Sequence, residues 1–232
     1  MAERSILITG CSSGIGYHAA HGLKARGWRV FATCRRAADC DRLRAEGLES
    51  FPLDYADEDS IASALAEVLT RTGGTLDALY NNGAFASPGL VEDLPRGALR
   101  EIFEVNLFGY HDLTRRVIPV MRAQGHGRII NCSSVLGLVG LQWRGAYVAT
   151  KFAMEGLTDV LRMEMEGTGI HVSLIEKIRQ CHKTASFSYV VGVTRDLCFI
   201  IGIIILSPLR FTCSVPFRKI PGKRFSQSCR KV

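Results

Sequence analysis

Residues 5–16, which read SILITGCSSGIG, decide the fold of this chain. The short apolar run at 5–9 predicts a buried β-strand, and glycines follow it at positions 10, 14 and 16. The segment from Gly14 to about Arg26 reads as a helix that ends at Gly27. A strand, a glycine-containing turn and a helix in this order are typical of the first unit of an α/β protein.

The turn between this strand and this helix has the properties of a phosphate-binding loop. Glycines leave the backbone N–H groups uncovered, and the start of the next helix adds the positive end of its dipole. We therefore interpret the turn as a binding site for the pyrophosphate of a dinucleotide, with an ordinary strand–turn–helix connection as the alternative. The residues assigned to it are Thr9, Gly10, Ser12, Ser13, Gly14, Ile15 and Gly16.

Strands and helices alternate along the chain as far as Glu176. Further strands are predicted at 28–33, 48–53, 76–80, 128–132 and 170–175. Helices are predicted from a cap at Asp57 to about 71, over about 99–122, and over about 146–166. The strands are apolar along their whole length, which indicates a parallel sheet covered by helices on both faces. The predicted fold class is α/β, a Rossmann-type doubly wound parallel sheet in three α/β/α layers.

Charge divides the chain at the place where this alternation stops. Of the 232 residues, 1–176 contain 18 basic and 21 acidic side chains, whereas 177–232 contain eleven basic ones and a single acid, Asp196. The overall composition, 47% hydrophobic and 22% charged, is that of an ordinary globular protein. We therefore expect one α/β domain over 1–176 and an atypical basic tail over 177–232.

The tail contains one apolar run, LCFIIGIIIL at 197–206. Ten residues are too few to span a bilayer, which takes about 20. Because basic residues lie beside the run, contact of the tail with an anionic membrane surface is an alternative role. The tail has no aromatic interleaving and no nucleic-acid-binding motif, so we expect no nucleic-acid partner.

The eight cysteines bear on metal binding and on the cellular compartment. None of them forms a CxxC pair, and no Cys/His spacing matches a zinc site, so we expect no metal. No signal peptide is recognisable before the first strand. We expect reduced thiols and a cytoplasmic location.

The residues after the second strand, Thr33-Cys34-Arg35-Arg36, bear on which dinucleotide is bound. A site that prefers NAD usually has an acid here to hold the ribose 2′-hydroxyl. Guanidinium groups pair well with phosphate, so Arg35 favours NADP over NAD, and a solvated basic loop is the alternative. Asp54, at the end of the third strand, is placed to bind the adenine amino group or, alternatively, to form a turn.

Tyr147 and Lys151 lie four residues apart on a predicted helix, so they share one face. A tyrosine with a pKa near 10 must lose its proton more readily to act as a base, and a nearby ammonium lowers that pKa. The spacing alone is common on protein surfaces. Ser134 supports a catalytic site, because it ends the fifth strand at the ligand-binding edge of the sheet and can hold a substrate carbonyl. Strand alternation should direct its neighbour Ser133 elsewhere.

Taken together, these segments resemble the short-chain dehydrogenase/reductase family. They follow in the family's order and spacing over residues 5–176, and they look most like bacterial NADP-dependent aldehyde reductases and the hydroxysteroid or retinol dehydrogenase branch. The motifs that carry the resemblance are TGxxxGxG at 9–16, Asn81-Asn82-Gly83-Ala84, Asn106, Ser134 and Tyr147-Val148-Ala149-Thr150-Lys151.

The resemblance implies an oxidoreductase that transfers a hydride between NADP(H) and a small carbonyl or alcohol substrate of aldehyde, ketone, retinoid or steroid type. Tyr147 would be the general acid in reduction and the base in oxidation. Lys151 would hold the nicotinamide ribose and lower the pKa of Tyr147. Ser134 would orient the substrate, and Asn106 would bind a water that relays protons to Lys151.

The resemblance also implies further contacts and an assembly. Asn82 and its neighbours, Gly83 among them, would line the adenine ribose side of the dinucleotide. Relatives often associate through the helix that bears Tyr147, so a homodimer or a homotetramer is expected.

The sequence departs from the family pattern at two places. The family usually has NNAG where this chain has Asn81-Asn82-Gly83-Ala84, and because both exchanged residues are small we expect little effect. After Glu176 the family continues with Pro-Gly and a Thr-containing loop that contacts the nicotinamide and covers the substrate, whereas this chain reads Lys177-Ile178-Arg179. The alternative function is therefore a catalytically impaired dinucleotide-binding protein.

Overall fold

The computed structural model describes residues 4–177 together with 190 and 191. Six parallel strands form one sheet in the order β3-β2-β1-β4-β5-β6, and a short β7 (Val190–Val191) pairs antiparallel with the end of β6. This order confirms the predicted Rossmann-type fold. The parallel strands are β1 (Ser5–Ile8), β2 (Arg29–Cys34), β3 (Glu49–Pro52), β4 (Ala78–Asn81), β5 (Gly127–Ser134) and β6 (Ile170–Lys177).

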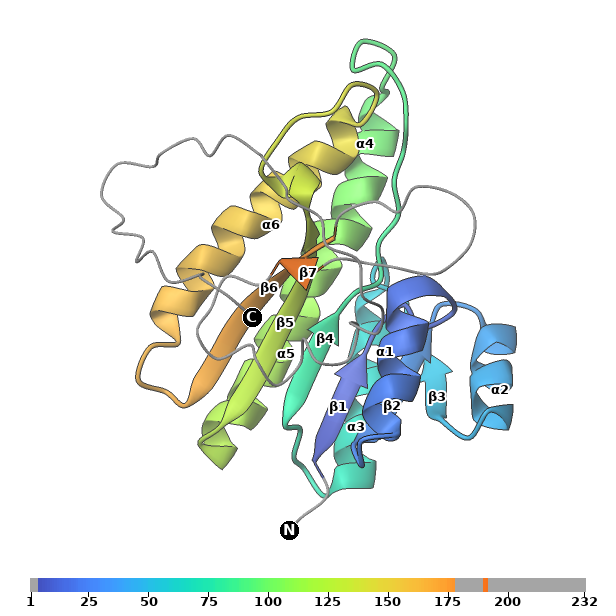
Figure 1. Ribbon diagram of the computed structural model, residues 1–232, viewed down its shortest axis with the longest axis vertical. Helices are drawn as coiled ribbons and strands as arrows, with labels where there is room; N and C mark the ends of the chain where they lie inside the picture. Colours follow the sequence, from blue (N-terminus) through green and yellow to red (C-terminus); the bar gives the residue numbers. More distant parts are fainter. Residues whose placement is uncertain (1–3, 178–189, 192–232) are drawn as a thin grey trace, which may run out of the picture.

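Helices cover both faces of the sheet, as Figure 1 shows. On one face lie α1 (Gly14–Lys24) and α2 (Ala37–Ala45). On the other face lie α3 (Glu58–Thr72), α5 (Gly109–Gln124) and α6 (Gly145–Glu164). A shorter helix, α4 (Arg96–Phe103), leads into α5 through a π-helical segment, Glu104–Phe108.

The hydrophobic core forms two layers, one under each set of helices. Alternate residues of β1 divide between them, with Leu7 in one layer and Ile6 and Ile8 in the other. Both faces of the strand are therefore buried, which is why the strands are apolar along their whole length.

Two helical features differ from the sequence prediction. The helix α2 was not predicted, because only Cys40 and Leu43 of its nine residues are buried and its apolar pattern is weak. The helical stretch predicted over about 99–122 is present and runs over 96–124, but the π-helical segment Glu104–Phe108 divides it into α4 and α5. The strand boundaries, by contrast, differ from the predicted ones by no more than two residues.

The start of α3 is capped as the sequence predicts. The carboxylate of Asp57 accepts hydrogen bonds from the backbone N–H groups of Asp59 (3.0 Å) and Ser60 (3.2 Å). The helix ends at Gly73, which takes a left-handed conformation with φ of 71°. These contacts satisfy backbone groups that the helix ends would otherwise leave unpaired.

The basic tail lies mostly outside the described residues, and so does the apolar run 197–206. Only Lys177, which ends β6, and the two residues of β7 belong to the described part of the tail. Within the described ranges, none of the helices combines the length and the apolar character that crossing a bilayer requires.

Candidate active site

Most of the predicted site residues meet in one cavity of about 380 Å³ at the carboxyl ends of the strands. In a doubly wound sheet this edge, beside the first strand, is where ligands bind. The predicted residues that line the cavity are Gly10, Ser12, Ser13, Gly14, Ile15, Asn82, Gly83, Tyr147 and Lys151. The lining also includes residues that sequence reasoning did not assign, namely Ala84, Phe85, Ala86, Cys132, Ser133 and Lys177.

The glycines of the first turn allow it to approach the end of β4. Gly10 has φ of +66°, and a Cβ placed on it would lie 2.5 Å from the Cα of Gly83. Gly16 does not line the cavity; a Cβ there would lie 2.5 Å from the Gly10 carbonyl oxygen. The side-chain amide of Asn82 donates to the carbonyls of Thr9 (3.0 Å) and Gly10 (3.2 Å). Glycine is therefore required here for close backbone packing as well as for an open turn.

Thr9 is buried and does not line the cavity. Its buried hydroxyl oxygen accepts hydrogen bonds from the backbone N–H groups of Asn82 (2.9 Å) and Gly83 (3.1 Å). The hydroxyl also lies 2.8 Å from that of Tyr55, which donates to Asn81 (2.6 Å). In this structure Thr9 joins β1 to β4, and a direct contact with a cofactor stays a prediction. The sequence carries no signal for the part that Tyr55 plays.

Tyr147 and Lys151 share one face of α6, and both face the cavity. The Lys151 side chain is 1% exposed, and its Nζ donates to the carbonyl oxygen of Cys132 at 2.7 Å. The same Nζ lies 5.6 Å from the centre of the Tyr147 ring. Burial lowers the pKa of the Lys151 ammonium to about 8, although Cys132 and Glu155 act to raise it.

The expected lowering of the Tyr147 pKa is not found in this structure. Burial raises the pKa of the phenol and a negative charge at Cys132 would raise it further, while a hydrogen bond with Ser134 lowers it. The physical reason is that the Lys151 ammonium is hydrogen-bonded to a backbone carbonyl, and desolvation of the half-buried phenol outweighs the favourable contacts.

The two neighbouring serines point in different directions, as strand alternation predicts. The hydroxyl of Ser134 donates to the Lys177 carbonyl (3.1 Å) and accepts from the N–H of Leu136 (3.2 Å). The hydroxyl of Ser133 instead donates to Glu155. The cavity lining includes Ser133 and not Ser134, so the expectation that strand alternation directs Ser133 away from the site is wrong. Ser134 nevertheless acts on Tyr147, because it lowers the pKa of that phenol.

Asn106 is fully buried within the π-helical segment and does not line the cavity. Its amide donates to the carbonyl of Phe85 (2.8 Å) and accepts from the N–H of the same residue (3.0 Å). The amide nitrogen also lies 3.3 Å from the Thr150 hydroxyl. Asn106 therefore holds the chain after β4 against α6, while its part in a proton relay stays a prediction.

The two residues assigned to the adenosine side, Arg35 and Asp54, also lie outside the cavity lining. Arg35 is exposed just after β2. Asp54 accepts a hydrogen bond from the N–H of Ala56 (3.0 Å), so it takes part in a turn, and its contact with the adenine amino group stays a prediction. A second guanidinium, that of Arg42 on α2, donates to the Ser12 carbonyl at 2.6 Å. Sequence reasoning missed Arg42 because it missed α2.

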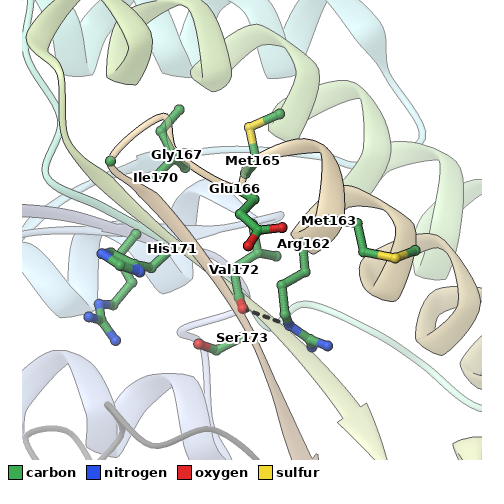
Figure 2. A pocket seen from close by; sticks show the side chains of 11 residues that line it. Arg162, Met163, Met165, Glu166, Gly167, Ile170, His171, Val172 and Ser173 are labelled. Atoms are coloured by element: carbon green, nitrogen blue, oxygen red, sulfur yellow. Dashed lines mark hydrogen bonds between the residues drawn. The ribbon is translucent and has the colours of Figure 1, made fainter. Parts of the chain in front are cut away.

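Another cavity, of about 440 Å³, lies at the opposite edge of the sheet (Figure 2). It is formed by the start of β6 and the end of α6, where Arg162 donates to the Val172 carbonyl at 3.2 Å. No residue that we assigned to chemistry or to cofactor binding lines it. The cavity at the carboxyl ends of the strands is therefore the candidate active site.

Comparison with known proteins agrees with this arrangement. The family profile described as short chain dehydrogenase matches residues 4–177. The chain is 42% identical over 174 residues to the uncharacterized oxidoreductase YbbO of Escherichia coli, covering 75% of this chain and 65% of that protein. It is 37% identical over 188 residues to human 17-beta-hydroxysteroid dehydrogenase type 1, covering 76% and 56% of the two chains.

A solved structure is also similar. The crystal structure of a short-chain dehydrogenase from Streptomyces avermitilis matches with a TM-score of 0.74 at 34% identity, over 82% of this chain and 72% of that one. The chain spans less than two thirds of the length of the two curated relatives named above.

Proposed function

Because this chain belongs to the short-chain dehydrogenase/reductase family, we propose that it transfers a hydride between NADP(H) and a small carbonyl or alcohol substrate. Membership of the family supports an oxidoreductase that acts on alcohol or carbonyl groups with a nicotinamide dinucleotide. The observation that carries the proposal is the placement of Tyr147 and Lys151 on one face of α6, in the cavity that the glycine turn also lines.

The residues of the first turn fit a dinucleotide. Ser13, at the N-cap of α1, makes no capping hydrogen bond with its side chain, and the first turn of the helix has no acidic residue. The N–H groups and the positive dipole end of α1 are therefore suited to an anionic pyrophosphate. We assign Ser12, Ser13 and Ile15 to this contact, and Asn82 with Gly83 to the adenine ribose side.

The choice of NADP over NAD rests on the residues after β2. Arg35 is exposed there, in the place where an NAD-preferring site has an acid. A guanidinium is suited to the 2′-phosphate that distinguishes NADP.

The bound dinucleotide supplies or accepts the hydride. In carbonyl reduction Tyr147 gives its proton to the substrate oxygen, and Ser134 holds that oxygen. Burial raises the pKa of Tyr147, so the phenol carries its proton at neutral pH in this structure. Lys151 binds the nicotinamide ribose. Asn106 binds a water that relays protons to Lys151.

The substrate class is proposed from the relatives. Their names include oxidoreductases, a 17-beta-hydroxysteroid dehydrogenase and retinol dehydrogenase 8, which supports aldehydes, ketones, retinoids or steroids as substrates here. We also propose a homodimer or homotetramer formed through α6, because this helix exposes Phe152, Val160 and Met163. The four described cysteines are free thiols, which supports a cytoplasmic location.

The direct test is NADPH oxidation by the full chain with a panel of aldehydes and ketones, run in parallel with NADH. We expect turnover with at least one carbonyl and a lower KM for NADPH than for NADH. Absence of turnover with every member of the panel, in both directions, contradicts the proposal.

A second candidate is a catalytically impaired dinucleotide-binding protein over residues 1–176. It is favoured by one observation: the match to the family profile stops at Lys177, and the family's Pro-Gly segment is replaced there. Loss of the contacts that orient a substrate can remove several kcal/mol of catalysis while binding survives. Calorimetric binding of NADP without any turnover identifies this second function.

A further inference from the structure

A partly buried carboxylate, Glu155, lies beside the candidate active site and has no part in the proposed reaction. It stands one helical turn after Lys151 on α6, and the hydroxyl of Ser133 on β5 donates a hydrogen bond to it. A Cβ placed on Gly137 would lie 2.9 Å from Glu155 Cγ and Oε1 and from Ser133 Oγ. The end of β5, the short 3₁₀ turn Val135–Gly137 and α6 therefore converge on this one side chain.

The hydrogen bond between Ser133 and Glu155 restrains the end of β5. Ser133 lies between Cys132 and Ser134, and each of these neighbours acts on a proposed catalytic residue. On one side, the carbonyl of Cys132 accepts the hydrogen bond from Lys151 at 2.7 Å. On the other side, Ser134 donates to the Lys177 carbonyl at 3.1 Å and lowers the pKa of Tyr147. Because the three residues are consecutive, a fixed Ser133 limits how far either neighbour can move.

The charges around Glu155 come from two elements. The charged groups on α6 are Lys151, Asp159 and Arg162. Those on β6 are Glu176 and Lys177. The charge of Lys177 lowers the pKa of Lys151. Burial raises the pKa of Glu155, the hydrogen bond from Ser133 lowers it, Asp159 raises it, and the charges of Arg162 and Lys151 lower it. Glu155 in turn is one of the groups that raise the pKa of the buried Lys151.

We propose that Glu155 is a positioning residue of this active site: it fixes the end of β5 through Ser133, and its carboxylate, one helical turn after Lys151 on α6, supports the ammonium form of that buried side chain. The proposal rests on the proposed function, because Lys151 and Ser134 have catalytic roles only if a hydride is transferred in this cavity. Its two parts, the hydrogen bond and the charge, are separable by mutation.

The charge is tested by a titration that does not depend on turnover. Glu155→Gln keeps the size and the acceptor oxygen but removes the charge, and Glu164→Gln removes an exposed carboxylate from the same helix as a matched control. Lysines labelled with ¹³C at Cε are titrated by NMR, and the Lys151 signal is assigned by its loss in Lys151→Met. The midpoint in Glu155→Gln is expected about one pH unit below that of the wild type, and Glu164→Gln is expected to match the wild type.

The hydrogen bond is tested by turnover. Ser133→Ala removes the donor to Glu155 and leaves every charge in place, so kcat should fall about tenfold or more while the high-pH limb of kcat/KM stays at its wild-type position. Glu155→Gln should keep most of kcat at low pH and shift the high-pH limb downward in parallel with the NMR midpoint.

The outcomes separate this inference from the proposed function. A Lys151 midpoint in Glu155→Gln equal to that of the wild type overturns the inference, and so does an unchanged kcat in Ser133→Ala. A folded wild-type chain that shows no turnover contradicts the proposed function instead, and the NMR titration still decides whether Glu155 sustains the charge of Lys151. Should Glu155→Gln fail to fold, Glu155→Asp, which keeps the charge, is expected to fold and to hold the midpoint near the wild-type value; a midpoint as low as that expected for the neutral variant overturns the inference.

Discussion

Replacing Lys151 with methionine should stabilise the folded chain at neutral pH. The side chain is 1% exposed, and burial lowers its pKa from 10.5 to about 8. That difference corresponds to about 3 kcal/mol by which burial disfavours the ammonium form. Methionine cannot donate to the Cys132 carbonyl, which Lys151 reaches at 2.7 Å, and this lost bond costs about 1–2 kcal/mol. The net gain in the free energy of unfolding at pH 7 is therefore about 1–2 kcal/mol.

The gain should depend on pH in a defined window. Between pH 8 and 10.5 the unfolded chain binds a proton at Lys151 that the folded chain has released, so the stability of the wild type rises with pH there. Lys151→Met lacks this dependence. Its advantage over the wild type should be largest below pH 8, shrink by about 3 kcal/mol as the pH rises to 10.5, and change sign within that interval.

The assay is urea unfolding followed by circular dichroism at several pH values from 7 to 10, with the difference between Lys151→Met and the wild type taken at each pH. Lys24→Met, which removes an exposed lysine from α1, controls for the loss of one positive charge. A difference that stays constant over the whole range refutes the reasoning, because it would mean that the buried ammonium is not destabilised by its surroundings.

Four further substitutions test other contacts. Thr9→Val removes the acceptor of two backbone N–H groups at the end of β4 and should lower the free energy of unfolding by about 2–4 kcal/mol, measured in urea. Thr33→Val removes one bond of 3.2 Å to a carbonyl and should cost only about 1 kcal/mol, so equal losses in the two variants would contradict this account. Arg35→Glu should weaken NADP binding more than NAD binding in calorimetry; an equal effect on both would exclude a 2′-phosphate contact. Asp57→Ala removes the cap of α3 and should lower the melting temperature through a loss of about 1 kcal/mol, and an unchanged value would show that the cap is not needed.

The sheet was predictable from the sequence because both of its faces are buried. A strand such as β1 contributes Leu7 to one core layer and Ile8 to the other, so apolar residues run continuously until a turn interrupts them. The glycine turn and the cap at Asp57 were predictable for a related reason, since each has a local chemical requirement that few residue types meet.

Features that depend on tertiary packing were not predictable. The helix α2 buries only Cys40 and Leu43, which leaves too little periodicity to detect. Thr9 was assigned to the cofactor, yet its hydroxyl binds N–H groups that lie 73 and 74 residues further along the chain. No local pattern could reveal so distant a contact.

The electrostatics of the site show the same limit. Spacing places Lys151 beside Tyr147, and the structure confirms that both face the cavity. Spacing does not show that the ammonium bonds the Cys132 carbonyl or that burial raises the pKa of the phenol. The balance between desolvation and charge depends on every group around the site, so it follows only from the folded arrangement.

The most direct test of the central claim is the turnover of Tyr147→Phe, measured as NADPH oxidation with a carbonyl that the wild-type chain reduces. The variant loses one hydroxyl and keeps the ring, so its dissociation constant for NADP should remain within a fewfold of the wild-type value. Its kcat should fall about 10²–10⁴-fold, because the proton donor is gone. A variant that retained the full kcat would show that Tyr147 is not the acid and that the proposed chemistry is wrong.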